Sequence, residues 1–258
     1  MKNERVNRIG LIKLNYQGCP MKIIEYNDAN NIIVEFQDEY NAKIHSAYRE
    51  FERGKIKNPY YPEVYNVGIV GNKYMVRSKH DRAIKEYDSW TNMLRRCFSK
   101  KLKEKQPTYE NISCCDEWLL YENFYEWLHG QPNYAKWKSG YRWGVDKDIL
   151  VKGNNIYSPE TCCLVPQNIN CLFTKSNASR GDLPIGVNRH GNKYRASFGI
   201  LNKTINLTVR NTIEEAFQDY KTYKESHIKQ VAKEEYSKGN ITKQCYDAMM
   251  KYEVEITD

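Results

Sequence analysis

The chain has 258 residues, with 40 Lys and Arg against 32 Asp and Glu, which leaves a formal net charge of +8. Hydrophobic residues make up 40% of the chain and aromatic residues 13%, which is enough for a folded core and excludes disorder throughout. No apolar run approaches the roughly 20 residues that a membrane-spanning helix needs, and no apolar stretch follows the basic start of the chain. We therefore expect neither a membrane partner nor a secretory signal.

Eight cysteines include two adjacent pairs, Cys114-Cys115 and Cys162-Cys163. Neighbouring cysteines cannot easily bridge each other, and the chain is long for a disulfide scaffold, so we expect reduced thiols and a cytoplasmic location. Several cysteines lie between positions 97 and 171, which leaves a zinc site open in principle. No pair has the C-x-x-C spacing of zinc knuckles, however, and buried free thiols are the alternative.

Residues 1–78 contain short β-rich runs separated by turn residues. The runs lie at 9–15, 21–26 and 32–36, and the last two read as a hairpin around the Asn- and Asp-rich stretch 27–31. Strands this short, at this spacing, predict a small β-barrel. The charge of this part is mixed, so it could bind DNA or a protein, and nothing in it favours a reaction.

Residues 82–178 combine helical and strand patterns. Apolar residues recur at helical spacing over 84–98, and Asp116 could cap a second helix that carries Trp118 and Phe124. A strand follows at 143–146, a tight turn at 152–155 and a short closing helix at 166–173.

Residues 180–236 read as three strands and a helix. The strands are predicted at 185–187, 193–200 and 204–209, and a capping box, Thr212-Ile213-Glu214-Glu215, opens the helix. The predicted fold class is therefore α+β. Residues 237–258 are expected to be a tail.

The predicted three-stranded sheet would be covered by the helix on one face and open on the other. Because side chains alternate along a strand, one set should face the helix: Tyr194, Ala196, Phe198, Ile205, Leu207 and Val209. The other set should face outward: Lys193, Arg195, Ser197, Thr204, Asn206, Thr208 and Arg210. Between positions 180 and 210 the sequence has six basic residues and one acidic residue, Asp182. A basic open sheet face is suited to phosphates and base edges, although a solvated surface is the plainer alternative.

Three stretches of this block carry a familiar pattern: Gly186-Val187, Lys193-Tyr194-Arg195-Ala196 and Thr212-Ile213-Glu214-Glu215-Ala216. Together they resemble the plant ethylene-response-factor type of DNA-binding domain, the Apetala-two fold, copies of which also occur in phage-type HNH homing endonucleases. The resemblance implies that the sheet lies in the major groove of double-stranded DNA, with Arg189, Arg195 and Arg210 among the contacts. The full set of predicted DNA-binding residues is Arg180, Arg189, Lys193, Arg195, Asn206 and Arg210.

The middle part contains a second ordered set of pieces: Trp90, Arg96-Cys97, Trp118, Val145-Asp146-Lys147, Gly153-Asn154, Ser158-Pro159-Glu160-Thr161-Cys162 and Gln167-Asn168-Ile169-Asn170. This order resembles the phage HNH endonuclease family, which has a ββα-metal core. The resemblance implies Mg²⁺-dependent hydrolysis of DNA, with an Asp on the metal, a His as general base, an Asn that orients the His, and a last metal ligand on the helix. Carried over, Asp146 and Asn170 are the metal residues, and Lys147 and Thr161 take the catalytic positions of base and orienting residue.

Lys147 departs from the family pattern, because the base should be a histidine. A protonated lysine cannot accept a proton, and the neighbouring Asp146 and Asp148 favour the charged form. An ammonium group is suited to phosphate contact instead. The open alternatives are an active nuclease, a nuclease fold retained for binding, and His129 as a replacement base. Asp146 could also be a salt-bridge partner of Lys147 or a turn-capping carboxylate.

The sequence thus predicts a phage-type DNA-binding protein with three folded parts, 1–78, 82–178 and 180–236, and a tail at 237–258. Its HNH-like core should be catalytically weak or inactive, with Mg²⁺ as cofactor only if the site is active. The partner would be double-stranded DNA, in the cytoplasm of a host cell. The alternative is a non-catalytic interaction protein that inhibits or sequesters a host defence factor, so that the partner is a host protein.

Overall fold

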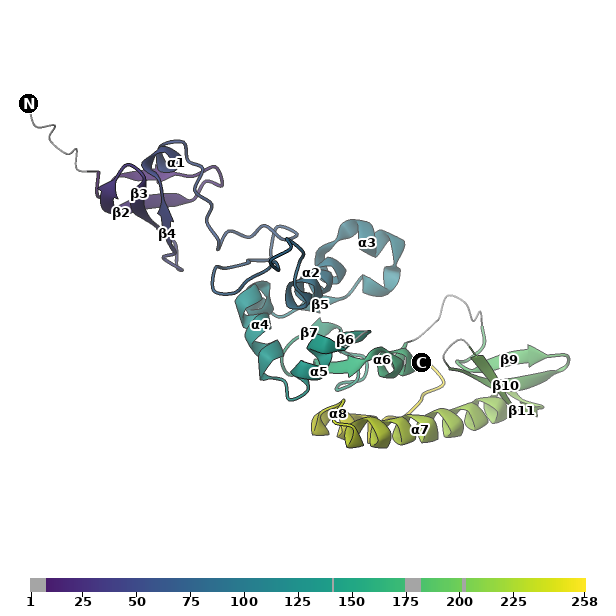
Figure 1. The fold of residues 1–258 in the computed structure, drawn as a ribbon. Coiled ribbons are helices and arrows are strands. Elements are labelled where there is room, and N and C mark those ends of the chain that lie inside the picture. Colours follow the sequence, from purple (N-terminus) through teal and green to yellow (C-terminus); the bar gives the residue numbers. More distant parts are fainter. Residues whose placement is uncertain (1–7, 141, 175–181, 201–202) are drawn as a thin grey trace, which may run out of the picture. The chain divides into compact units, whose positions relative to one another are not determined.

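A computed structural model describes residues 8–140, 142–174, 182–200 and 203–258 (Figure 1). Helices and antiparallel strands both contribute, so the predicted α+β class is confirmed. The chain divides into two compact units, residues 1–109 with 116–126, and residues 110–115 with 127–258.

The first unit begins with a four-stranded antiparallel sheet in the order β1-β2-β3-β4. The strands are β1 (Ile12–Leu14), β2 (Pro20–Asp28), β3 (Asn31–Phe36) and β4 (Lys43–Ser46), and α1 (Tyr48–Glu52) follows them. Alternate residues of β2 and β3 point into one core, as the period of two predicts. This core consists of Met21, Ile23, Ile32, Val34, Phe36, Ala42, Phe51 and Ile56.

The predicted closed barrel is wrong, because β1 and β4 are the two edges of the sheet and do not pair with each other in the described residues. Strand β1 has three residues and β4 has four, so each edge offers few backbone groups for a closing pair. A non-strand segment after α1 covers the end of β1 instead. The Tyr16 amide donates to the Gly54 carbonyl over 2.8 Å, and the Asn15 side-chain amide donates to the Ile56 carbonyl over 2.9 Å.

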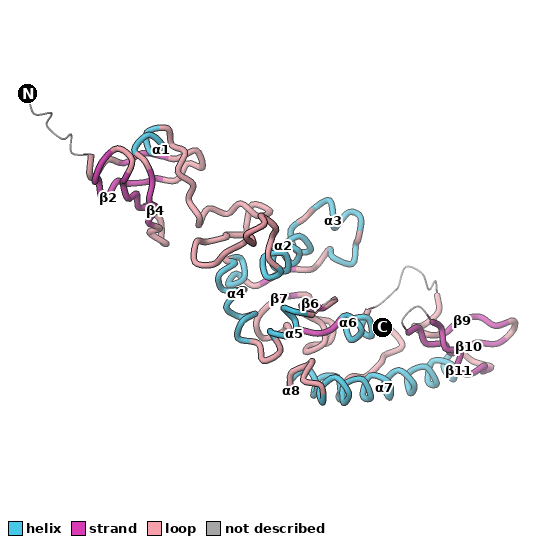
Figure 2. The backbone as a smooth tube through the Cα atoms, viewed as in Figure 1, coloured by secondary structure: helices cyan, strands magenta, loops and turns pink. Residues whose placement is uncertain are grey.

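Figure 2 shows the long stretch between α1 and α2 as loop. The buried carboxylate of Glu122 organises part of it, since Glu122 accepts hydrogen bonds from the backbone amides of Asn72 and Lys73. The helical spacing over 84–98 is confirmed by α2 (Lys85–Phe98), whose Trp90 indole donates to the Trp118 carbonyl over 2.7 Å.

Short elements complete the middle of the chain. They are α3 (Lys100–Lys105), η1 (Pro107–Tyr109), β5 (Ser113–Cys114), η2 (Asp116–Leu119), α4 (Tyr121–Gly130) and α5 (Tyr134–Ser139). Asp116 starts the 3₁₀ turn η2 and not the helix that was predicted there, because α4 begins at Tyr121.

The second unit contains two antiparallel strands and a helix in the order ββα. Strand β6 (Trp143–Asp146) pairs with β8 (Cys163–Pro166), and α6 (Gln167–Phe173) follows at once and packs on both. The loop between the two strands includes β7 (Ile156–Tyr157), which pairs in parallel with β5. Asp146 ends β6 and lies opposite Cys163.

The predicted three-stranded sheet with a helix is confirmed. Its order is β11-β10-β9, with β9 (Val187–His190), β10 (Lys193–Ile200) and β11 (Lys203–Arg210). Helix α7 (Ile213–Ser237) runs along one face of this sheet (Figure 1). Its start carries the predicted capping box, in which Thr212 and Glu215 each bond to the backbone of the other.

The ββα element, the sheet and the last residues of the chain share one core. Helix α8 (Lys243–Met250) packs on α7, and the core continues through Tyr252 and Val254. Residues 237–258 are thus folded where a tail was expected. The apolar residues of this segment recur too briefly to reveal a helix on their own.

Candidate functional site

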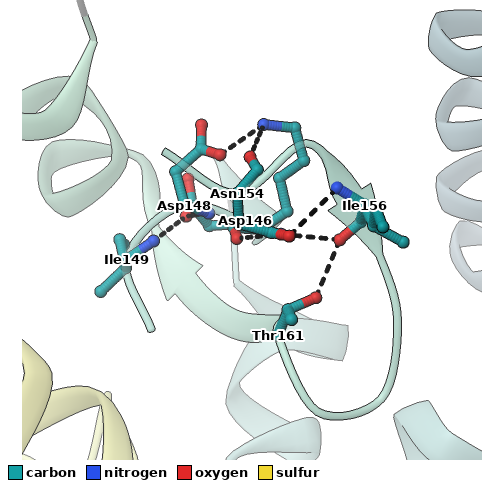
Figure 3. Close-up of polar contacts among 7 residues, drawn as sticks. Asp146, Asp148, Ile149, Asn154, Ile156 and Thr161 are labelled. Atoms are coloured by element: carbon teal, nitrogen blue, oxygen red, sulfur yellow. Dashed lines mark hydrogen bonds and ion pairs between the residues drawn. The ribbon is translucent and has the colours of Figure 1, made fainter. Parts of the chain in front are cut away.

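Asp146 is buried at the end of β6, and its carboxylate caps the turn that follows. Its Oδ1 accepts hydrogen bonds from the backbone amides of Asp148, at 2.8 Å, and Ile149, at 2.9 Å (Figure 3). Burial raises the pKa of Asp146, and the two backbone hydrogen bonds oppose that effect. The turn-capping alternative therefore describes what this carboxylate does in the structure.

Lys147 is also buried, and its ammonium group acts as a hydrogen-bond donor. It forms an ion pair with Asp148 and donates to the Asn154 carbonyl over 3.0 Å. The ammonium is the donor in both contacts, and an ammonium group has no lone pair with which to accept a proton from water. In the structure the Lys147 side chain thus pairs with Asp148 and with the backbone of Asn154.

Asn154 organises the loop after Lys147. Its side-chain amide donates to the carbonyl of Lys147 at 2.8 Å and to that of Ile156 at 2.7 Å (Figure 3). Gly153 precedes it with a φ of +78°, a backbone conformation that favours glycine. The sequence identified Gly153-Asn154 as part of a turn and as one piece of the HNH-like order, but it gave Asn154 no role in the site.

Thr161 does not make the orienting contact that its predicted position implies. Its hydroxyl donates to the Ile156 carbonyl over 2.8 Å (Figure 3). The same hydroxyl lies 3.0 Å from the Ser158 hydroxyl. The hydrogen bond to the backbone of Lys147 comes from Asn154 instead. Thr161 thus contacts Ile156 and Ser158 within the same loop.

Asn170 and His129 lie outside this loop, on two helices. Asn170 lies on α6, half-buried, and its carbonyl accepts a hydrogen bond from the Thr174 hydroxyl at 3.3 Å. His129 is exposed at the end of α4 and packs against the ring of Tyr134, with ring centroids 4.0 Å apart.

These residues are a poor fit for a resident metal ion. Mg²⁺ prefers several oxygen ligands in a near-octahedral arrangement, yet Oδ1 of Asp146 is already held by two amides and a lysine ammonium follows in the chain. Within the described ranges, no group of three or more His, Cys, Asp or Glu side chains could hold a metal. None of the eight cysteines, all of which lie in the described part of the chain, forms a disulfide.

A β-bulge decides which side chains lie on the open face of the C-terminal sheet. Arg195 lies opposite Val209 and Ser197 opposite Asn206, so two steps along β10 match three along β11. The extra residue reverses the alternation beyond Leu207. Val209, predicted to face the helix, lies on the face of Arg195 and is 43% exposed.

Arg210 consequently lies on the helix-covered face, contrary to the predicted alternation. It is opposite Tyr194, and its guanidinium binds the carboxylate of Asp219 on α7 at 2.6 and 3.2 Å. The Thr208 hydroxyl donates to the same carboxylate over 2.5 Å. The hydrogen bonds from Arg210 and Thr208 lower the pKa of Asp219.

The open face keeps Lys193, Arg195 and Asn206 together, as predicted. Arg195 lies opposite Asn188 and within 2.9 Å of both ring nitrogens of His190. Arg189 lies opposite Tyr194 and therefore on the helix-covered face of the sheet, and its side chain is exposed. Arg180 lies outside the described residues.

No protein-family model, curated protein or solved structure matches this chain. Within the described part of the chain, no helix is both long and apolar enough to cross a membrane.

Proposed function

We propose that this protein binds double-stranded DNA through the open face of the β9–β11 sheet. The observation that carries the proposal is the grouping of Lys193 and Arg195 with the amides of Asn188 and Asn206 on a face that α7 does not cover. No Asp or Glu occurs in the three strands. Cations bind phosphates, and amide and guanidinium groups can read base edges in the major groove.

The direct test of this proposal is titration of a labelled duplex with the protein at several salt concentrations. Phosphate contacts predict an affinity that falls linearly with the logarithm of the salt concentration. An affinity that does not respond to salt would contradict the proposal.

We further propose that the ββα element is an HNH-like core kept for binding, with weak or no nuclease activity. The capped carboxylate of Asp146 and the donating ammonium of Lys147 support this reading, because neither group is free to activate water. Incubation of plasmid DNA with Mg²⁺ or Mn²⁺ tests it, with Asp146→Ala as control. The protein would act in the cytoplasm, that of a host cell if a phage encodes it.

A second candidate function is that of a non-catalytic protein that inhibits or sequesters a host defence factor. One observation favours it. Edge strand β1 and the residues around it expose apolar side chains, with Ile12 63%, Leu14 59% and Tyr16 64% exposed. Exposed apolar edges are typical of protein-binding surfaces. Co-purification of a defined host protein, lost in Ile12→Asp and Leu14→Asp variants, would support this function over DNA binding.

A further inference from the structure

Lys152 lies in the loop between β6 and β8, close in sequence to Lys147, and acidic groups from the end of the chain surround it. Its ammonium lies 3.0 Å from the carboxylate of Asp258 and 3.3 Å from that of Glu255. It also donates to the carbonyl of Glu253 over 2.9 Å and lies 5.3 Å from the ring centre of Tyr252. Three oxygen atoms therefore surround the Lys152 ammonium, and two of them belong to carboxylates. The oxygens of a phosphate would bind the ammonium in the same way.

Residues 253–258, hereafter the acidic segment, are firmly anchored. Val254 is fully buried, and Asp258 is 6% exposed. The Val254 amide donates to the carboxylate of Glu225 over 2.8 Å, and its carbonyl accepts from the Lys221 ammonium over 2.8 Å. The contact with Lys152 is therefore built into the fold of the second unit.

The acidic segment also lies close to the loop that holds Lys147. Burial raises the pKa of Tyr252, and the negative charges of Asp258, Glu255 and Asp148 raise it further. Since Asp148 is the ion-pair partner of Lys147, both lysines of the loop are neutralised by carboxylates of the same chain.

We propose that Lys152 is a DNA-phosphate ligand and that the acidic segment occupies its site by presenting carboxylates where phosphates would bind. A DNA phosphate then competes with the carboxylates of Glu255 and Asp258 for one cation, and these side chains restrain DNA binding until a phosphate replaces them at Lys152 while Val254 stays anchored. A lysine ammonium can donate hydrogen bonds to a carboxylate or to a phosphate. The charge of Lys152 therefore stays paired when a phosphate replaces a carboxylate. The inference rests on the proposed function, because it concerns binding of the same duplex.

The test compares four proteins in duplex titrations over a range of salt concentrations. They are the wild type, the double variant Glu255→Gln/Asp258→Asn, Lys152→Ala, and the combination of all three substitutions. The amide variants keep the size of the side chains and remove their charge. A fifth protein, Glu253→Gln, is the control for the loss of one nearby negative charge, because the Glu253 side chain is exposed. Circular dichroism verifies that each variant is folded.

The double variant should bind DNA about three- to tenfold more tightly than the wild type. Its salt slope should be steeper by about 0.9, because Lys152 then binds one additional phosphate. The tighter binding should vanish when Lys152→Ala is added, and Glu253→Gln should change the affinity by less than about twofold.

An unchanged affinity in the double variant would overturn the inference. Tighter binding that persists without Lys152 would do so too, because it would show general charge repulsion. Both results leave DNA binding itself intact, whereas failure of every protein to bind DNA overturns the proposed function together with this inference.

Discussion

Arg195 and Arg210 form a matched pair that tests the proposed DNA-binding face. Both are arginines of the same sheet, but the β-bulge places them on opposite faces. We expect Arg195→Ala to weaken duplex binding, because its side chain lies on the open face beside Lys193 and Asn206. We expect Arg210→Ala to leave binding nearly unchanged, since its guanidinium already binds Asp219.

The magnitude follows from the number of cations on the open face. A base or phosphate contact from one arginine contributes about 1–3 kcal/mol, which corresponds to about 5- to 150-fold in Kd. Lys193 and Arg195 together would contribute about −1.8 to the slope of log affinity against log salt. Loss of Arg195 should therefore remove about half of the slope that this face supplies.

Fluorescence anisotropy with a labelled duplex of about 25 base pairs measures both quantities, and thermal unfolding verifies the fold of each variant. Arg210→Ala should lower the melting temperature, because its ion pair joins β11 to α7. Equal affinity losses in the two variants would show that the effect is general charge. A loss in Arg210→Ala alone would place the interface on the helix-covered side and refute the reasoning.

Three further predictions concern the candidate nuclease site and the packing of the sheet. First, the wild type should cleave DNA slowly or not at all with Mg²⁺, and Lys147→His should raise cleavage only if metal binding at Asp146, measured on both proteins, is retained, because a general base contributes about 10²–10⁴ in rate once a metal is bound. Rapid wild-type cleavage that Asp146→Ala abolishes and Lys147→Ala spares would show that the base lies elsewhere. Second, the raised pKa of buried Asp146 means that the folded protein holds this proton more tightly than the unfolded chain, so its contribution to stability falls as pH rises from about 4 towards neutrality. Asp146→Asn should remove that decline in urea unfolding at pH 4 to 7, and a stability difference that does not vary with pH would contradict the assignment. Third, Gly186→Ala should destabilise the protein by about 1–3 kcal/mol or more, because its φ is +77° and a Cβ would lie 2.0 Å from the Tyr220 ring. Gly191→Ala, with a φ of +60° and open space around it, is the matched control, and equal losses of melting temperature in the two would remove the packing argument.

Features set by neighbouring residues were accessible from the sequence alone. The apolar spacing over 84–98 predicted α2, and the Thr212–Glu215 capping box predicted the start of α7. Both depend on hydrogen bonds and contacts within a few residues, which the local pattern specifies. The three strands before α7 and the α+β class were predictable for the same reason.

Features that depend on pairing between distant segments required the tertiary structure. One extra residue in β11 moves Arg210 to the helix-covered face, and the strand pattern does not reveal it because a bulge is defined by the partner strand. Closure of the first sheet likewise depends on whether β1 and β4 meet, and here coil at Gly54 lies beside the end of β1 instead.

The candidate site divides in the same way. The resemblance to the HNH family grouped Asp146, Lys147 and Thr161 as one candidate site, and their order along the chain was enough for that. It could not assign the hydrogen bonds within the loop. The contact of Asn154 with the Lys147 carbonyl and the capping role of Asp146 depend on how the backbone turns after β6. A carboxylate that could bind a metal and one that caps a turn are the same residue in a sequence, and only the backbone amides around it decide between them.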